Sequence, residues 1–152
     1  MPTYVCSVSR GSLTSAQKQE IANAISRDHS EATGAPKFFV QVVIEEDKSA
    51  ARYLGGTLTN DHIWIRGDIR AGRTVERRKS LMQAIMKDVA QITGVKEDSI
   101  WVYLCNLDPT DMIEYGHVLP EPGQEKEWFE ALPESLKVYL AKLGTNEENF
   151  TL

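Results

Sequence analysis

The sequence predicts an α+β domain of two layers, in which a four-stranded mixed sheet carries two helices on one face. Three observations point to this class. Two segments of similar length each combine a strand, a helix and a second strand, and their helices align without a gap. The composition is that of a globular protein, with 41% hydrophobic and 26% charged residues. The length of 152 residues suits a single domain over 1–152.

The first unit begins with a strand over 4–8, where apolar and polar side chains alternate. Thr14 begins a helix, because Gln17 three residues later completes a capping box. Gly34 ends this helix. The almost continuous apolar run over 38–44 is typical of a strand that is covered on both faces.

The second unit follows the same order. Residues 62–65 are predicted to form a strand, and residues 70–73 a turn. The helix begins at Thr74 and ends at Gly94, with apolar residues spaced along one face. The apolar segment 100–104 is the returning strand.

The helices of the two units share six identical positions when they are overlaid with a period of 60 residues. The identical pairs are Thr14/Thr74, Ala24/Ala84, Ile25/Ile85, Asp28/Asp88, Thr33/Thr93 and Gly34/Gly94, and the same register places Arg10 against Arg70 and Pro2 against His62. We therefore predict a duplicated β-α-β unit, with pseudo-repeats at 2–45 and 62–105.

Outside the two units, the sequence predicts one hairpin and a C-terminal extension. Gly55-Gly56 in a polar stretch indicates a short hairpin between the units. The extension covers 108–152, and its predicted parts are a helical turn over 108–116, a Pro/Gly-rich link over 119–123, a helix around 136–143 and a frayed end over 145–152.

The predicted sheet has one face without a cover. Two consecutive β-α-β units place both helices on the same side, because crossovers of this kind are right-handed. The other face then presents Val, Phe and Trp side chains for which the chain has no further layer. We therefore expect the protein to form an oligomer through this face.

Charge and composition narrow the classes of partner. The chain has 17 Lys+Arg against 22 Asp+Glu and a net charge of −5, which disfavours nucleic acid as a partner. The sequence has no apolar run of the roughly 20 residues that cross a bilayer and no secretory signal at its start. Two cysteines, Cys6 and Cys105, are too few for a disulfide framework or a zinc site. We therefore expect a cytoplasmic protein with reduced thiols, no membrane contact and no metal.

Two residues of the first unit are candidates for acid–base chemistry. Removal of Met1 would leave Pro2 as a secondary amine at the head of a core strand, and α-amino groups titrate near pH 8. A Met-Pro start is also common in proteins without such a role. His29 stands on the apolar side of the first helix, where a buried histidine is either structural or part of a site.

Arg70 and Arg73 stand directly before the helix that begins at Thr74. Positive charge at a helix N-terminus opposes the helix dipole unless an anion lies between. Two guanidinium groups and free backbone N–H groups would form a clamp for a carboxylate. An exposed basic turn is the alternative, since Arg77 and other basic residues follow on the helix surface.

Tyr103 and Glu114 are candidates for the activation of water. Tyr103 alternates with Val102 and Leu104, so it lies on the opposite face of the sheet from those two. Glu114 follows the last core strand, and a Tyr–Glu pair can orient and deprotonate a water molecule. Taken separately, each is an ordinary surface residue.

Together these residues resemble the tautomerase superfamily, which uses an N-terminal proline. The resemblance is to the cis-3-chloroacrylic acid dehalogenase family, and it covers about residues 2–130. It rests on Met1-Pro2, His29, Arg70-Ala71-Gly72-Arg73, Ile100-Trp101-Val102-Tyr103, Glu114-Tyr115-Gly116 and the segment from Pro122-Gly123 to Trp128-Phe129. It implies a tautomerase (MIF-like) fold, a homotrimer of fused dimers and catalysis without a cofactor.

The resemblance also implies a role for each candidate residue. Pro2, once Met1 is removed, would be the catalytic amine. Arg70, Arg73 and His29 would bind the carboxylate of a small substrate. Glu114 and Tyr103 would activate water, so that 3-haloacrylate or propiolate becomes malonate semialdehyde.

Two alternatives stay open at this stage. The same fold could serve as a keto–enol tautomerase, for example of phenylpyruvate, or as a decarboxylase of a β-keto acid. It could also be a trimer that binds a carboxylate ligand without catalysis. Retention of Met1 would favour that last reading, because it would block the amine of Pro2.

Overall fold

The computed structural model describes residues 2–46 and 51–144 and is built around one four-stranded sheet. The strands in spatial order are β2 (Gln41–Glu46), β1 (Thr3–Val8), β5 (Ile63–Arg70) and β6 (Ile100–Leu107). Strand β1 runs parallel to β2 and antiparallel to β5, and β5 runs parallel to β6. The predicted mixed sheet is therefore confirmed.

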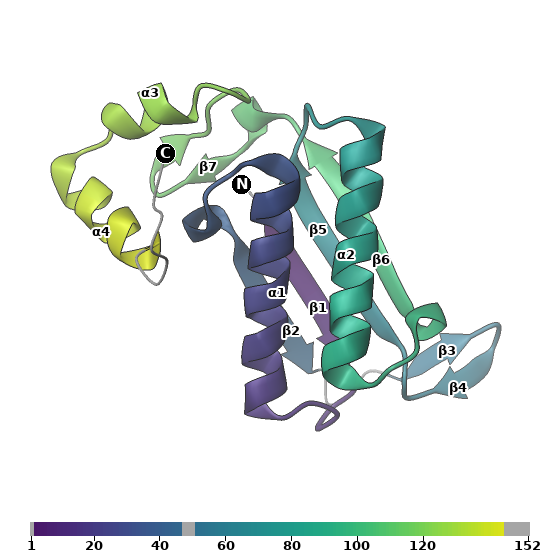
Figure 1. Cartoon of the computed structure of the whole chain (residues 1–152). Coiled ribbons are helices and arrows are strands. Elements are labelled where there is room, and N and C mark those ends of the chain that lie inside the picture. Colours follow the sequence, from purple (N-terminus) through teal and green to yellow (C-terminus); the bar gives the residue numbers. More distant parts are fainter. Residues whose placement is uncertain (1, 47–50, 145–152) are drawn as a thin grey trace.

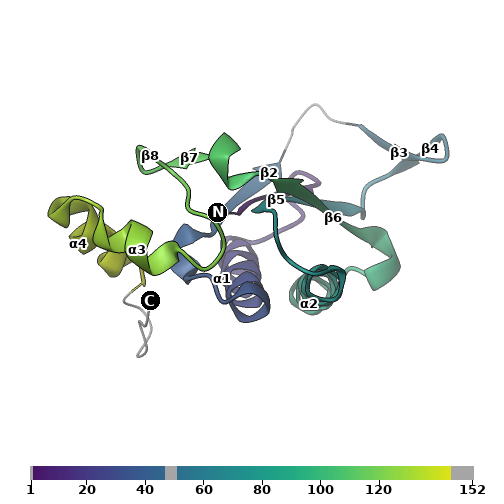
Figure 2. The same ribbon diagram turned by 90° about the horizontal axis from the view of Figure 1, so that it is seen from above.

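Helices α1 (Ser15–Thr33) and α2 (Val75–Thr93) lie side by side on one face of this sheet, as Figures 1 and 2 show. The Thr14 side chain accepts a hydrogen bond from the backbone N–H of Gln17, and the Gln17 side chain bonds back to Thr14, so the predicted capping box is present. Gly34 and Gly94 end the two helices with φ of 74°. Both helices thus begin and end at the expected residues.

The main core lies between this sheet and the two helices. It contains Tyr4, Cys6, Val8, Ile21, Ile25, Ile65, Ile69, Leu81, Ile85 and Val89, all of them almost inaccessible to solvent. Gly67 in β5 is required by this packing, because a Cβ atom there would lie 2.4 Å from the Tyr4 ring. Tyr4 thereby fills the space that a side chain at position 67 would take.

The opposite face of the sheet is not covered by any other element among the described residues. Trp64, Trp101 and Tyr103 form a row of aromatic rings on it, with Trp101 stacked on Tyr103 at a centroid distance of 6.3 Å. Trp101 is 43% exposed and Tyr103 48% exposed. Large apolar side chains this exposed are typical of an interaction surface.

Two short hairpins flank the sheet. Strands β3 (Arg52–Leu54) and β4 (Thr57–Thr59) form the hairpin predicted at Gly55-Gly56, and Figure 2 shows it projecting from the body. The second hairpin is formed by β7 (Ile113–Glu114) and β8 (His117–Val118).

This second hairpin corrects the prediction of a helical turn over 108–116. Only Pro109–Asp111 form a turn of 3₁₀ helix. Tyr115 has φ of 52° and Gly116 φ of 79°, and two consecutive positive φ angles make the tight turn of a β-hairpin. The hydroxyl of Tyr115 donates a hydrogen bond to the carbonyl of Phe38 at 2.9 Å, which stabilises this turn against the body of the protein.

The strand predicted over 38–44 begins later than expected. Lys37–Phe39 form a 3₁₀ turn, and β2 starts only at Gln41. Phe38 and Phe39 pack into a second core cluster with residues of the C-terminal extension. The apolar run therefore reflects two separate cores rather than a strand that is covered on both faces.

The C-terminal extension continues with α3 (Glu125–Glu130) and α4 (Glu134–Gly144), in agreement with the helix expected around 136–143. The second core cluster joins them to the turn at Phe38 and Phe39 through Leu119, Phe129, Leu132 and Leu140. The end predicted to fray, 145–152, lies outside the described residues.

Within residues 2–46 and 51–144, no helix is long and apolar enough to span a membrane. The same residues contain no group of three or more metal-ligating side chains. Cys6 is a free thiol in the core, and Cys105 is a free, half-buried thiol.

Candidate active site

Pro2 lies at the head of β1 and is fully buried. Its carbonyl accepts a hydrogen bond from the backbone N–H of Gln41 at 3.0 Å, which joins it to the start of β2. The core strand therefore holds this residue in place. After removal of Met1, the ring nitrogen of Pro2 would be a secondary amine in a sheltered position.

His29 faces β1 from helix α1. Its Nδ1 atom shares a hydrogen bond of 2.8 Å with the hydroxyl of Tyr4, and only 2% of the histidine is exposed. Burial, followed by the positive charge of Arg73, lowers the pKa of His29 to about 3. Burial likewise raises the pKa of the Tyr4 hydroxyl. Both groups are neutral near pH 7, so His29 can offer a hydrogen bond but no charge.

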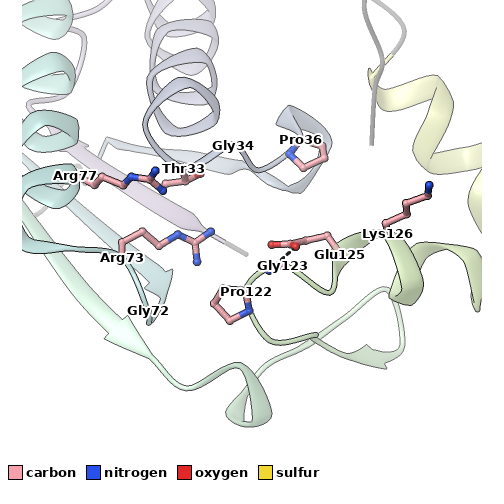
Figure 3. Close-up of a pocket in the computed structure, with 10 residues that line it drawn as sticks. All are labelled: Thr33, Gly34, Pro36, Gly72, Arg73, Arg77, Pro122, Gly123, Glu125 and Lys126. Carbon is pink, nitrogen blue, oxygen red and sulfur yellow. Dashed lines mark hydrogen bonds between the residues drawn. The ribbon is translucent and has the colours of Figure 1, made fainter.

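Arg73 lies between the end of β5 and the start of α2 and faces a cavity of about 510 Å³ (Figure 3). Its guanidinium donates long hydrogen bonds of 3.4 Å to the carbonyls of Arg70 and Ala71. Burial and the charge of Arg70 lower the pKa of Arg73. An anion in this cavity would offset the repulsion between the charges of Arg70 and Arg73.

Figure 3 also shows which groups face each other across this cavity. Arg73 and Arg77 point inward from one side, and the Glu125 carboxylate points inward from the other. Lys126 also lines the cavity, but its side chain points away from the two arginines. The only carboxylate among the described lining residues is thus that of Glu125.

Arg70 does not belong to the turn that was predicted over 70–73. It is the last residue of β5 and only 3% exposed. Its guanidinium donates a hydrogen bond to the Pro120 carbonyl at 2.6 Å and forms an ion pair with Glu125. Arg70 therefore already holds a carboxylate, but one from the protein itself.

Glu114 lies in a second cavity, of about 500 Å³, between the β7–β8 hairpin and the start of the sheet. Thr3, Gln41 and Tyr115 are among the residues that line it. Burial and the nearby Glu114 charge raise the pKa of Tyr115. The cavity places a carboxylate near the head of β1, because Thr3 directly follows Pro2.

Tyr103 is not brought to Glu114 within one chain. It lies on β6, whereas the Glu114 cavity lies beside β2 at the opposite edge of the sheet. Three strand spacings of about 4.8 Å separate the two edges by about 14 Å. The neighbours of Tyr103 are instead Trp64 and Trp101 on the open face.

The sequence did not indicate two residues that the structure brings into this region. Tyr4 was interpreted only as a strand residue, although its alternation with Pro2 and Cys6 places it on the helix side of β1. Glu125 was one acidic residue among several in the extension, and no local signal pointed to Arg70.

The arrangement combines groups with different chemistry around the start of β1. The cavity lined by Arg73 provides positive charge, and the cavity beside the β7–β8 hairpin provides the Glu114 carboxylate. Pro2 lies at the head of β1. Such a combination can bind a small anion and move protons without a metal.

Comparisons with known proteins agree with this fold. Residues 1–132 match the Tautomerase_3 family, which is described as "Putative oxalocrotonate tautomerase enzyme". Among proteins with curated functions, no significant sequence match was found.

Solved structures give a closer comparison. The structure of N1, a member of the cis-3-chloroacrylic acid dehalogenase (cis-CaaD) family, is 33% identical, with a TM-score of 0.88 over 92% of this chain and 99% of N1. Native Ps01740 is 28% identical, with a TM-score of 0.70 over 74% of this chain and 99% of its own. The "Q0 fused 4-OT wild type symmetric trimer" is 25% identical, with a TM-score of 0.71 over 77% of this chain and 94% of its own. The chain therefore belongs to the tautomerase superfamily and, within it, to the cis-3-chloroacrylic acid dehalogenase family.

Proposed function

We propose that the protein is a cofactor-independent hydratase or dehalogenase of small three-carbon unsaturated acids, with Pro2 as its catalytic amine. The observation that carries this proposal is the pair of cavities at the start of β1, one with arginine and one with Glu114. The cavity with arginine would bind the carboxylate of a substrate, and the cavity with Glu114 would activate water. Membership of the cis-3-chloroacrylic acid dehalogenase family supports the same chemistry.

In the proposed reaction, Arg73 and Arg70, with His29, bind the substrate carboxylate and draw electrons toward it. Glu114, with Tyr103, takes a proton from water, and the resulting hydroxide adds to C3 of a 3-haloacrylate. The Pro2 ammonium gives its proton to C2. The halohydrin then loses hydrogen halide to form malonate semialdehyde, and propiolate gives the same product by addition of one water.

Assembly completes the site in this proposal. Because Tyr103 lies on the open face about 14 Å from the Glu114 edge, a neighbouring copy of the chain would bring its own Tyr103 to the site. We propose a homotrimer, in line with the fused 4-OT structures that are described as trimers. The open aromatic face is the surface that such a contact would cover.

The test is a steady-state assay of protein whose mass shows that Met1 has been removed. cis-3-Chloroacrylate, propiolate and phenylpyruvate are offered separately, and malonate semialdehyde is measured for the first two. We expect turnover of at least one three-carbon acid, with kcat reduced about 10²- to 10⁴-fold by Glu114→Gln. Asp111→Asn is the matched control, because Asp111 lines the same cavity and should leave kcat unchanged.

Tautomerisation is the second candidate, and the family match favours it. A keto–enol tautomerase needs the Pro2 amine but no activated water, so Glu114→Gln would retain the wild-type rate on phenylpyruvate. No turnover of any three-carbon acid, together with that retained rate, would replace the hydratase proposal by this one. Unchanged activity in Pro2→Ala would exclude both.

A further inference from the structure

The side chain of Arg70 is already bound to a carboxylate that the chain itself supplies. We propose that Glu125 is an internal ligand of the anion site, which the carboxylate of a substrate must displace. Glu125 then determines how tightly the site binds carboxylates. The inference rests on the proposed function only in taking Arg70 and Arg73 as the anion site.

Glu125 binds Arg70 as a substrate carboxylate would. One of its carboxylate oxygens is paired with the Arg70 guanidinium. The other accepts a hydrogen bond from the backbone N–H of Gly123 at 2.8 Å. Burial acts to raise the pKa of Glu125, but the hydrogen bonds that the carboxylate accepts and the charge of Arg70 together outweigh burial, so the pKa is lowered. The carboxylate is therefore charged and held at both oxygens.

The two side chains of this ion pair, Arg70 and Glu125, differ in their exposure to solvent. The Arg70 side chain is 2% exposed, so its charge cannot stay unpaired without a large desolvation cost. The Glu125 side chain is 23% exposed and faces the cavity, so it can turn toward water. Loss of the ion pair is consequently costly unless a second anion takes the place of Glu125 at Arg70.

Glu125 and Arg70 belong to different parts of the fold. It is the first residue of α3, a helix of six residues that follows the Pro/Gly-rich link. Arg70, by contrast, is fixed at the end of the central strand β5. An exchange of anions at Arg70 therefore requires the Glu125 side chain to turn away and leaves the strand that carries Arg70 unchanged.

The charges around the cavity favour a second anion. Arg73 and Arg77 line one side of it, and the charges of Arg70 and Arg77 both act to lower the pKa of Arg73. The single Glu125 carboxylate leaves part of this positive charge uncompensated. An entering carboxylate first meets Arg73 and then competes with Glu125 for Arg70.

The first experiment measures the binding of propionate, a three-carbon carboxylate that cannot react, by isothermal titration calorimetry. We expect Glu125→Gln to bind propionate about tenfold more tightly than the wild type, because the competing charge is gone. Glu121→Gln is the matched control, since Glu121 lies in the same link but is exposed, and it should bind as the wild type does. Equal or weaker binding by Glu125→Gln would overturn the inference and make Glu125 a residue that orients Arg70.

The second experiment uses the wild-type protein alone and follows backbone hydrogen exchange over 119–130. Saturating propionate should speed exchange at Gly123, whose N–H loses its partner when Glu125 is displaced. Sodium chloride at equal ionic strength should not. Slower or unchanged exchange with propionate, or no propionate binding to any variant, would overturn the proposal. Neither experiment needs turnover, so an inactive protein that still shows the exchange would count against the proposed function alone.

Discussion

Arg73 and Arg77 line the same cavity but differ in their surroundings. Arg73 is half-buried, and its pKa is lowered by burial and by the Arg70 charge, whereas Arg77 is exposed on α2. A charge in a partly buried place interacts more strongly with a ligand than one that water screens. The two residues should therefore contribute unequally to the binding of a carboxylate.

We expect Arg73→Ala to raise KM for a three-carbon acid about ten- to a hundredfold, because a charge-assisted hydrogen bond to the substrate is lost. Arg77→Ala should change KM about fivefold or less. Steady-state kinetics of the two variants at the same ionic strength measures the difference. Equal effects would mean that the cavity attracts anions only through its overall charge.

Asp28 is a buried acid between the two helices. Burial and the charge of Asp88 raise its pKa to about 6 from an ordinary 3.8, although Arg27 donates a hydrogen bond to it at 3.1 Å. Above pH 6 the folded state must hold this carboxylate charged, which the unfolded state does at no cost. The contribution of Asp28 to stability is therefore complete below pH 3.8 and is lost as the pH rises through about 6.

Asp28→Asn should consequently stabilise the protein by about 1–3 kcal/mol at pH 8, and the advantage should vanish near pH 4. Urea unfolding of both proteins across this pH range measures it. Asp88→Asn is the comparison: it removes the neighbouring charge but also the ion pair of Asp88 with Arg27, so it should give a smaller gain. A variant that is less stable than the wild type at pH 8 would contradict the assignment.

At the scale of residues, the sequence indicated which residues lie near the site better than it indicated which side chains bind one another. His29, Arg73 and Glu114 were candidates by residue type and position, the family resemblance grouped them into one site, and each lies beside a cavity or the head of β1. The ion pair of Arg70 with Glu125 joins residues 55 positions apart. No local pattern encodes such a pairing, because it depends on where the extension packs.

Among the elements, the helices were the most predictable. Thr14 and Gly34 mark the ends of α1 by chemistry that acts over three or four residues, so the sequence alone reveals it. The hairpin at Tyr115-Gly116 was missed because tyrosine rarely takes a positive φ. The start of β2 was missed because Phe38 and Phe39 serve a core that is built by distant residues.

Strand β5 provides a test of packing at the scale of an element. Gly67→Ala would place a methyl group against the Tyr4 ring and the Leu104 side chain, which are 2.4 and 2.9 Å from the added atom. We expect the free energy of unfolding to fall by about 1–3 kcal/mol. Chemical denaturation measures the loss.

A double mutant identifies the cause of that loss. When Tyr4 is replaced by leucine, the further change Gly67→Ala should cost less than it does in the wild type, because the ring that the methyl group meets is absent. An equal cost in both backgrounds would show that Leu104 or the backbone, rather than Tyr4, limits the space.

At the scale of the whole molecule, the proposed assembly depends on the open face of the sheet. Trp101 is packed between His62, at a centroid distance of 4.6 Å, and Tyr103, yet it remains 43% exposed. Exposed aromatic side chains that gather on one face are typical of an interaction surface. The face was predictable because both crossovers place their helices on the same side, whereas the prediction of three subunits rests on the family resemblance.

We expect sedimentation velocity to show a trimer for the wild type and a shift toward monomer for Trp101→Glu, because a buried charge at the interface would be unpaired. Lys79→Glu is the control, since Lys79 is exposed on α2, which lies on the other face. A wild-type protein that is monomeric at all concentrations would contradict the proposed assembly. Activity should fall with the trimer if a neighbouring copy supplies Tyr103.

The two β-α-β segments of the sheet begin differently. This difference limits how many sites in an assembly can contain a terminal amine. Strand β1 follows Pro2, which would carry a free amine once Met1 is removed, but β5 follows His62, which is bonded to Asp61 and so carries no free α-amine. One polypeptide thus offers one N-terminal nitrogen for two structurally similar strand heads. An assembly of three chains would hold six such heads and only three terminal amines, so at most half of these positions could work through an N-terminal proline.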